Sequence, residues 1–298
     1  MFRVFFAVLA LLGGIASNLS AYELAIGSMF RNEAPYLKEW VEYHFAAGVE
    51  HFWLYNDNST DNWQEVLQPY IESGIVEVTY WPTPPGSYYT PTQVEAFKDA
   101  IKQAQGNTTW VALIDIDEFL VPMQGRSIPR CLNKYFSNAS AIYVNWRNFG
   151  TGGVYIPQGE PILFRLTASS LSTHSDNAIG KSIVRPEAVD LASVWYPHHF
   201  ILKQDANYYN GDRQKMFFRG MDLPTDGVHY DRFIRINHYV LRDEGFYQNV
   251  RLAKANQGSS DKNLLLEHYD SFSAVQDYSI IKFIQNNFQP KYKKIWKD

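Results

Sequence analysis

The stretch WVALIDIDEFLVP, residues Trp110–Pro122, carries the strongest structural signal in the chain. An apolar run, Val111–Ile114, leads directly into Asp115 and Asp117 before hydrophobic residues resume. Buried carboxylates are costly unless they have a charged partner or a cation. Because side chains alternate along a strand, we expect Asp115 and Asp117 to share one side while Glu118 turns away. Two such carboxylates suit a divalent ion that binds phosphate oxygens, and a solvated strand end is the alternative.

Strand and helix signals alternate through the first half of the chain. Apolar runs typical of strands occupy residues 24–29, 51–55, 75–81 and 110–114, and amphipathic segments typical of helices occupy residues 34–47, 61–70 and 91–104. Crossovers of this length predict βαβ units, and therefore an α/β fold with a mainly parallel central sheet. Further strand signals at 141–146, 181–184, 199–202 and 234–240, and a helix signal at 278–288, follow without a clear linker. One catalytic domain over residues 22–298 is therefore predicted.

Polar residues follow three of these strands: Arg31, Asn32 and Glu33 after the first, Asp57 after the second, and Asp115 and Asp117 after the fourth. Ligands of parallel sheets bind beyond the carboxyl ends of the strands. These residues are far apart in sequence, yet we expect them along one edge of the sheet, where they favour a site. Asp57 could accept hydrogen bonds from a base or a ribose, and an Asx turn is the alternative.

The composition limits the class of protein. Of the 298 residues, 46% are hydrophobic and 19% are charged, which indicates a large core and excludes a disordered chain. The net charge of −4 argues against a nucleic-acid partner, which requires a basic face. Cys131 is the single cysteine, so neither an intrachain disulfide nor a thiolate metal site can form.

The N-terminus has the pattern of a targeting segment. Arg3 precedes an apolar run over residues 4–16, which is short for a membrane span of about 20 residues. Residues 1–21 are therefore interpreted as a signal peptide or an uncleaved signal anchor, with a buried helix as the alternative. The flanking charges send the rest of the chain across a membrane, so membrane association through the N-terminus is expected. The expected location is the Golgi membrane or lumen of the secretory pathway in a eukaryote, and an exported or membrane-associated state in a bacterium.

Several common metal and cofactor motifs are absent. The acidic loop from Asp57 lacks the Gly and the Glu that an EF-hand requires, and the chain has no HExxH, GxSxG or GxxxxGK[ST] sequence. Most of the scattered histidines are expected to be structural, but His238 stands out because it lies late in an apolar strand. Lys181 and Arg185 could neutralise a phosphate group, with ordinary surface charges as the alternative.

Five stretches together resemble glycosyltransferase family 92, a family of GT-A fold related to the family 2 transferases. They are RNEAPYLKEWVEYHFAAGVEHFWLYNDNSTD (31–61), WVALIDIDEFLVP (110–122), VNWRNFGTGG (144–153), GKSIVRPEAV (180–189) and RINHYVLRDEGF (235–246). The stretches fall in the expected order and cover residues 24–250. The combination is specific, whereas a DxD motif alone is common.

The resemblance implies a UDP-sugar donor, a glycan acceptor and a divalent ion, usually Mn²⁺, with Mg²⁺ as the substitute. It places the ion on Asp115 and Asp117, with His238 completing the metal or diphosphate contacts, and it lines the nucleotide pocket with residues 31–33 and Asp57. Relatives are described as inverting enzymes, some of which add galactose. Inversion requires a general base on the acceptor hydroxyl, and four candidates without a supporting motif are Asp176, Asp205, Asp212 and Asp226.

The sequence therefore predicts a metal-dependent inverting glycosyltransferase that moves a hexose, galactose by analogy with the family, from UDP to a glycan hydroxyl. Two other functions stay open. One is an inactive transferase that still binds sugar or nucleotide, and the other is a nucleotidyl or phosphoryl transferase that uses the same carboxylate pair.

Overall fold

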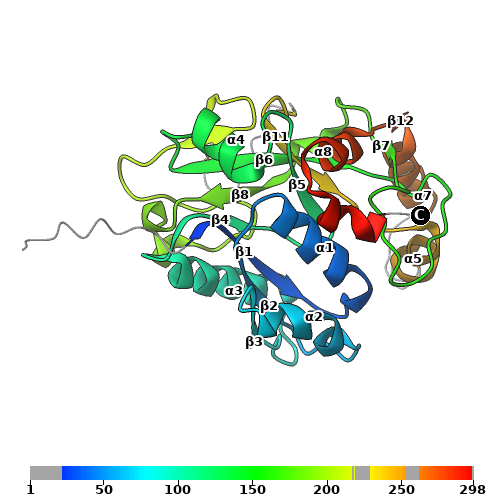
Figure 1. The fold of residues 1–298 in the computed structure, drawn as a ribbon, viewed down its shortest axis with the longest axis horizontal. Helices are drawn as coiled ribbons and strands as arrows, with labels where there is room; N and C mark the ends of the chain where they lie inside the picture. Colours follow the sequence, from blue (N-terminus) through cyan, green and yellow to red (C-terminus); the bar gives the residue numbers. More distant parts are fainter. Residues whose placement is uncertain (1–21, 217, 219–228, 253–261, 297–298) are drawn as a thin grey trace, which may run out of the picture.

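The computed structural model describes residues 22–216, 218, 229–252 and 262–296, which form an α/β fold around a ten-stranded sheet (Figure 1). Its neighbouring strands run in the order β10–β9–β6–β8–β4–β1–β2–β3, and β11 pairs with both β5 and β6. The strands of the sheet are β1 (Tyr22–Phe30), β2 (His51–Asn56), β3 (Val76–Tyr80), β4 (Thr108–Leu113), β5 (Glu118–Pro122), β6 (Ala141–Asn148), β8 (Gly180–Val184), β9 (Tyr208–Asn210), β10 (Lys215–Met216) and β11 (Ile234–His238). The helices are α1 (Ala34–Ala46), α2 (Trp63–Glu72), α3 (Tyr89–Ala104), α4 (Ile128–Tyr135), α5 (Glu244–Phe246), α7 (Lys262–Asp270) and α8 (Ser279–Asn287).

The first half of the chain forms four parallel strands with helices on both faces. In the order β3–β2–β1–β4 all neighbouring pairs are parallel, as the βαβ pattern predicts. Helices α1 and α2 pack on one face through Leu37 and Leu67, and α3 packs on the other through Phe97 (Figure 1). Gly27 of β1 permits a close approach of α3, because a Cβ at this position would lie 2.6 Å from the Cβ of Ala100. The α/β class and the mainly parallel sheet are confirmed.

The second half of the chain extends the sheet and brings a further strand to the same edge. Strand β8 lies antiparallel between β4 and β6, so its first residues stand beside the end of β4. Strand β11 is antiparallel to β5 and parallel to β6, which pairs His238 with Glu118 on one side and with Asn148 on the other. The last residue of β11 therefore lies next to the turn between β4 and β5.

One expectation from the sequence needs correction, one lies outside the described residues, and one helix was not expected. Residues 199–202 do not form a strand, since only Leu202 makes an isolated bridge, to Val189. Helix α4 has no counterpart among the expected elements; Ser127 caps it by accepting the backbone N–H of Arg130. The predicted signal segment, residues 1–21, lies outside the described residues, and no helix within them is long and apolar enough to cross a membrane.

Candidate functional site

Polar side chains from three parallel strands meet at the carboxyl edge of the sheet, as the sequence predicted. Burial raises the pKa of Tyr89, at the start of α3, and so do four nearby carboxylates: Asp115, Glu33, Asp57 and Asp117. The Tyr89 hydroxyl also donates to the carbonyl of Met29 near the end of β1, at 3.3 Å. The acids that follow β1, β2 and β4 all raise the pKa of the Tyr89 hydroxyl, so they lie around one common site.

The acids of the DIDE sequence lie in a tight turn and do not continue strand β4. Strand β4 ends at Leu113, and the turn is closed by the Glu118 N–H, which donates to the Asp115 carbonyl at 3.1 Å. The Glu118 carboxylate is fully buried and accepts the backbone N–H of Asp115 at 2.9 Å. The expectation that Glu118 turns away by strand alternation is therefore wrong, because a turn breaks the alternation. Glu118 instead holds the backbone of the acidic turn.

Asp115 is engaged by cationic and amide donors from two other elements. Gln93 of α3 donates to its Oδ1 at 2.6 Å, and the Nζ of Lys181, at the start of β8, lies 3.0 Å from its Oδ2. Lys181 is almost fully buried; burial opposes its charge, but Asp115 and Glu118 outweigh burial and raise its pKa. The predicted phosphate-binding Lys181 is thus at the site, where it neutralises the acidic turn.

Asp117 faces a histidine and an arginine across the site. The Nε2 of His238 and the guanidinium of Arg251 each lie 3.8 Å from its Oδ2. Burial opposes the charge of Asp117, yet Arg242, His238 and Arg251 lower its pKa. Asp117 therefore stays ionised and offers a carboxylate to the site.

His238 is held as a neutral imidazole with one nitrogen directed at Asp117. Its Nδ1 lies 2.8 Å from Oδ1 of Asn148, and an amide oxygen only accepts, so Nδ1 carries the proton. Burial lowers the pKa of His238 to about 4. The Nε2 lone pair is therefore free to coordinate a metal ion on the side of Asp117.

An ion pair between buried Arg242 and the partly exposed Glu33 connects the loops after β11 and β1. Arg242 donates to Glu33 at 2.7 Å and to the carbonyl of Ile116 at 3.2 Å, and its guanidinium stacks on Tyr36. Burial of Glu33 raises its pKa to about 7, and Arg242 opposes this rise. Arg242 thus ties the acidic turn to the loop after β1.

Arg31 and Asp57 form an ion pair at the ends of β1 and β2. The carboxylate of Asp57 also accepts the N–H and the hydroxyl of Thr83, at 2.6 and 3.0 Å. Burial opposes its charge, but the bonds from Arg31 and Thr83 lower the pKa of Asp57. Asn32 has a left-handed backbone (φ 56°) and joins the two loops by accepting the N–H of Thr60 at 2.7 Å. Asp57 is therefore occupied by its own chain, and it is the half-exposed Arg31 side chain that faces solvent.

Not every predicted residue comes to this edge. Arg185 lies past the opposite end of β8, where its guanidinium stacks on Trp110 at 4.2 Å and donates to the carbonyl of Ala139. Arg185 therefore does not lie at the donor site. Because β8 runs antiparallel to β4, the first residues of β8 lie beside the end of β4, and Arg185 follows the last residue of β8 at the opposite edge. Asp205 and Asp212 lie on the loops around β9, far along the sheet order, and Asp226 is outside the described residues.

Sequence reasoning missed four residues of the site. They are Tyr89 and Gln93 of α3, and Arg242 and Arg251 in the segment after β11. The two arginines could have been predicted from their position after β11, because residues that follow a strand ending at this edge lie at the same edge. The α3 residues show no such signal, because they lie at the start of a helix.

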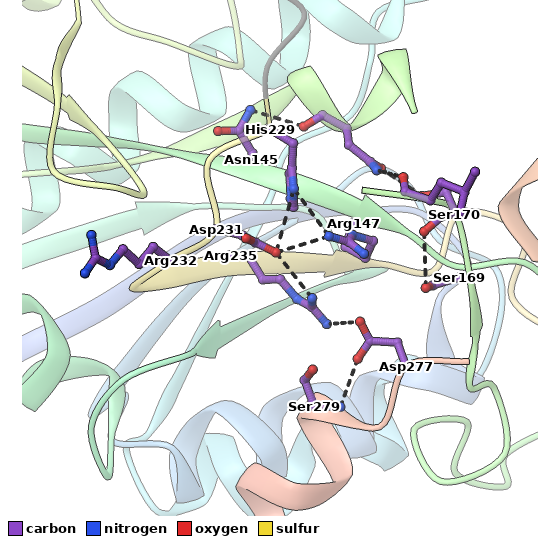
Figure 2. Close-up of polar contacts among 12 residues, drawn as sticks. Asn145, Arg147, Ser169, Ser170, His229, Asp231, Arg232, Arg235, Asp277 and Ser279 are labelled. Carbon is purple, nitrogen blue, oxygen red and sulfur yellow. Dashed lines mark hydrogen bonds and ion pairs between the residues drawn. The ribbon is translucent and has the colours of Figure 1, made fainter. Parts of the chain in front are cut away.

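Figure 2 shows a polar network around Arg235 of β11. In this network, Arg147 pairs with Asp231 at 3.2 Å and Arg235 pairs with Asp277 at 2.7 Å. Two guanidinium groups and two carboxylates balance in charge, as buried ions require. Because side chains alternate along β11, satisfying Arg235 on one face directs His238 to the other.

With this geometry established, comparison with known proteins gives the family. The family model for glycosyltransferase family 92 matches residues 22–255, most of the chain. The chain belongs to glycosyltransferase family 92. The resemblance noted in the sequence is therefore confirmed.

Curated family-92 proteins from plants are similar over most of this chain. One from Ricinus communis is 28% identical over 248 residues, which are 81% of this chain and 41% of the relative. One from Oryza sativa is 28% identical over 278 residues, covering 90% of this chain and 45% of the relative. The family-92 chain thus spans less than half the length of these relatives.

Two bacterial solved structures are similar in chain course. Staphylococcus aureus TarS covers 92% of this chain and 77% of its own, with 11% identity and a TM-score of 0.39. Glucosyl-3-phosphoglycerate synthase of Mycobacterium tuberculosis, solved with Mn²⁺, UDP and its product, covers 42% of this chain and 44% of its own, with 15% identity and a TM-score of 0.29. At these identities and TM-scores, the two structures do not indicate which ligands the family-92 chain binds.

Proposed function

We propose that this family-92 glycosyltransferase moves a hexose from a UDP-sugar to a glycan hydroxyl, with a divalent ion and with inversion at the anomeric carbon. Galactose is the hexose proposed, by analogy with the family. The observation that carries the proposal is the pairing of an ionised Asp117 with a neutral His238 at the carboxyl edge of the sheet, 3.8 Å apart.

Asp117 and His238 are the residues that would hold Mn²⁺ or Mg²⁺. No group of three or more His, Cys, Asp or Glu side chains that could hold a metal is found within the described residues. The pair Asp117 and His238 nevertheless fits, because a ligating histidine usually donates its second N–H to a neighbouring oxygen, here that of Asn148. When bound there, the ion would supply Lewis-acid stabilisation of the leaving diphosphate. Asp115, held by Gln93 and Lys181, would contribute as a charge beside the ion.

Three cations would then receive the negative charge of the diphosphate. Lys181, Arg242 and Arg251 surround the acidic turn, and a third of the Arg251 side chain is exposed. Guanidinium groups bind phosphate oxygens with two parallel hydrogen bonds, so Arg251 is the residue best suited to direct contact. Arg31, half exposed beside Asp57, would serve the nucleotide in the same way at the end of β2.

Donor turnover tests this proposal. Purified enzyme would be incubated with UDP-galactose, UDP-glucose or UDP-GlcNAc and a panel of p-nitrophenyl glycosides, with Mn²⁺, Mg²⁺ or EDTA, and UDP release measured. We expect metal-dependent release with one donor, an inverted product anomer by NMR, and loss of release in Asp117→Asn. The matched control is Asp205→Asn, because Asn also tolerates the left-handed backbone of Asp205 (φ 68°).

Two results would reject it. UDP release that persists at the wild-type Mn²⁺ rate in EDTA, or in Asp117→Asn, would remove the metal from the mechanism. Metal-dependent UDP binding without turnover of any donor would favour the inactive sugar- or nucleotide-binding protein, and release of UMP or of free phosphate would favour the nucleotidyl or phosphoryl transferase.

We also propose that residues 1–21 direct the enzyme across a membrane, to the Golgi lumen in a eukaryote or out of the cytoplasm in a bacterium. The apolar run after Arg3 supports this. Protease protection of the full chain in sealed vesicles tests it, and digestion without detergent would contradict a lumenal location.

A further inference from the structure

The general base of the reaction is the one role that the site leaves unfilled. The carboxylates nearest the acidic turn are bound by cations and donors of their own chain, as Glu33 is by Arg242 and Asp57 is by Arg31 and Thr83. A base must reach the acceptor hydroxyl, so it needs an accessible carboxylate at the same edge of the sheet.

Asp176 is carried to this edge by the start of β8. It lies in the short 3₁₀ segment η1 (Ser175–Ala178), which leads directly into β8. Lys181, five residues further on, contacts Asp115 at 3.0 Å. Asp176 thus precedes, on the same segment, the residue that anchors the acidic turn, and 31% of its side chain is exposed.

Buried hydrogen bonds connect η1 to the proposed metal ligand His238. Asn177, next to Asp176, accepts both the backbone and the side-chain N–H of Asn148 at 3.1 Å. Asn148 in turn accepts the ring N–H of His238 at 2.8 Å. Because Asn148 and Asn177 are both buried, the position of Asp176 relative to His238 is fixed by a rigid chain of contacts.

The Asp176 carboxylate is held by a histidine from the C-terminal segment. The Nε2 of His268, in α7, lies 3.1 Å from its Oδ2. On the other side, His174 Nδ1 accepts the backbone N–H of Asp176 at 3.2 Å, and His174 Nε2 lies 2.8 Å from the Ser271 hydroxyl. The second oxygen, Oδ1, accepts the Ser175 hydroxyl at 3.3 Å and lies 4.0 Å from His174 Nδ1. Neighbouring side chains thus orient the carboxylate, as a third group orients a base.

The other candidates lack this placement. Asp212 accepts the N–H of Arg232 at 2.8 Å and belongs to the turn between β9 and β10. Asp205 lies on the loop before β9, near the far end of the strand order. Of the three candidates within the described residues, Asp176 alone is joined to the edge where β4 and β11 end.

We propose that Asp176 is the general base and that His268 positions it; this inference rests on the proposed function. The acceptor hydroxyl oxygen forms a bond to the anomeric carbon while its proton passes to Asp176. The bond from that carbon to the β-phosphate oxygen breaks, and its electron pair leaves with UDP. His268 lies beyond residue 255, so the site would draw a residue from outside the segment that the family model matches.

Transfer kinetics with UDP-galactose, Mn²⁺ and p-nitrophenyl glycoside acceptors test the assignment. In Asp176→Asn we expect kcat to fall by about 10²–10⁴-fold, the usual contribution of a general base, while calorimetric UDP affinity stays within about twofold. Asp212→Asn is the matched control and should keep wild-type kcat. His268→Ala should lower kcat and change the donor KM by a smaller factor. His268→Gln retains an N–H donor and should restore part of the lost kcat.

Each outcome decides the question. If Asp176→Asn and Asp212→Asn have the same kcat, Asp176 is not the general base, and the proposed function is left intact. Loss of UDP binding or of thermal stability in Asp176→Asn would show a structural residue and also refute it. Absence of transfer by the wild-type enzyme with every donor would reject the proposed function, and the base with it. Equal kcat in His268→Ala and wild type would remove the positioning role.

Discussion

Replacing Asn148 with alanine tests whether His238 is prepared as a metal ligand. The Asn148 oxygen is the partner of His238 Nδ1, at 2.8 Å, and both residues are buried. Without it, the ring N–H is left unpaired at a cost of about 1–3 kcal/mol, unless the proton moves to Nε2. That move would direct an N–H at Asp117, 3.8 Å away, and remove the lone pair that would coordinate the proposed ion.

The expected loss follows from the neighbours of metal-ligating histidines, whose removal typically weakens metal binding by about 10–100-fold. This corresponds to about 1.4–2.7 kcal/mol. The assay is a titration of Mn²⁺ in the presence of UDP, with free Mn²⁺ followed by electron paramagnetic resonance. Ser170→Ala is the control, since it removes a 3.0 Å bond to Asn177 in the same network but does not contact His238. Unchanged Mn²⁺ affinity in Asn148→Ala, or an equal loss in Ser170→Ala, would refute the reasoning.

Three further predictions concern stability, measured by urea unfolding. Arg242→Ala should destabilise the enzyme by about 1–3 kcal/mol, because the bonds from Arg242 to Glu33 and to the Ile116 carbonyl are lost while Glu33, a quarter exposed, can take up a proton. Wild-type stability would contradict a stabilising role for this pair. Glu39 is fully desolvated and its pKa is raised to about 7; its stabilisation is therefore present below its usual pKa and lost as pH rises through 7. For this group, unfolding free energy should decline over that interval by up to about 1.4 kcal/mol per pH unit. Glu39→Gln should make the decline shallower, and Glu33, whose pKa is also raised to about 7, accounts for part of the remainder. Gly27→Ala should cost about 1–3 kcal/mol because its Cβ would lie 2.6 Å from Ala100, and wild-type stability would show that α3 moves away freely.

The sequence predicted the parallel half of the sheet because its signals are local. Each strand from β1 to β4 is a short apolar run, each intervening helix has an apolar face, and parallel pairing then places the strand ends at one edge. These local signals are sufficient to predict that Arg31, Glu33, Asp57 and the acidic turn lie at a common edge. They do not reveal that a turn starts after Leu113, because the apolar residues on both sides of the acids suit a continuous strand equally well.

Long-range pairing explains what the sequence could not supply. Lys181 and Arg185 are four residues apart and chemically alike, yet β8 carries one to the site and the other past the opposite edge. The antiparallel insertion of β8 between β4 and β6 determines which of the two residues reaches the site, and no local sequence pattern predicts this pairing. Arg242 and Arg251 reach the site in the same way, through the pairing of β11 with two strands distant in sequence.

Calorimetric binding of UDP with and without Mn²⁺, in the wild-type enzyme and in Asp117→Asn, tests the proposed metal-dependent donor site most directly. The wild-type enzyme should bind UDP at least about tenfold more tightly with Mn²⁺ than with EDTA, a difference of about 1.4 kcal/mol. Asp117→Asn should show no such difference, while Asp205→Asn should behave as wild type. Equal UDP affinity in Mn²⁺ and EDTA for the wild-type enzyme would contradict a metal site on Asp117 and His238.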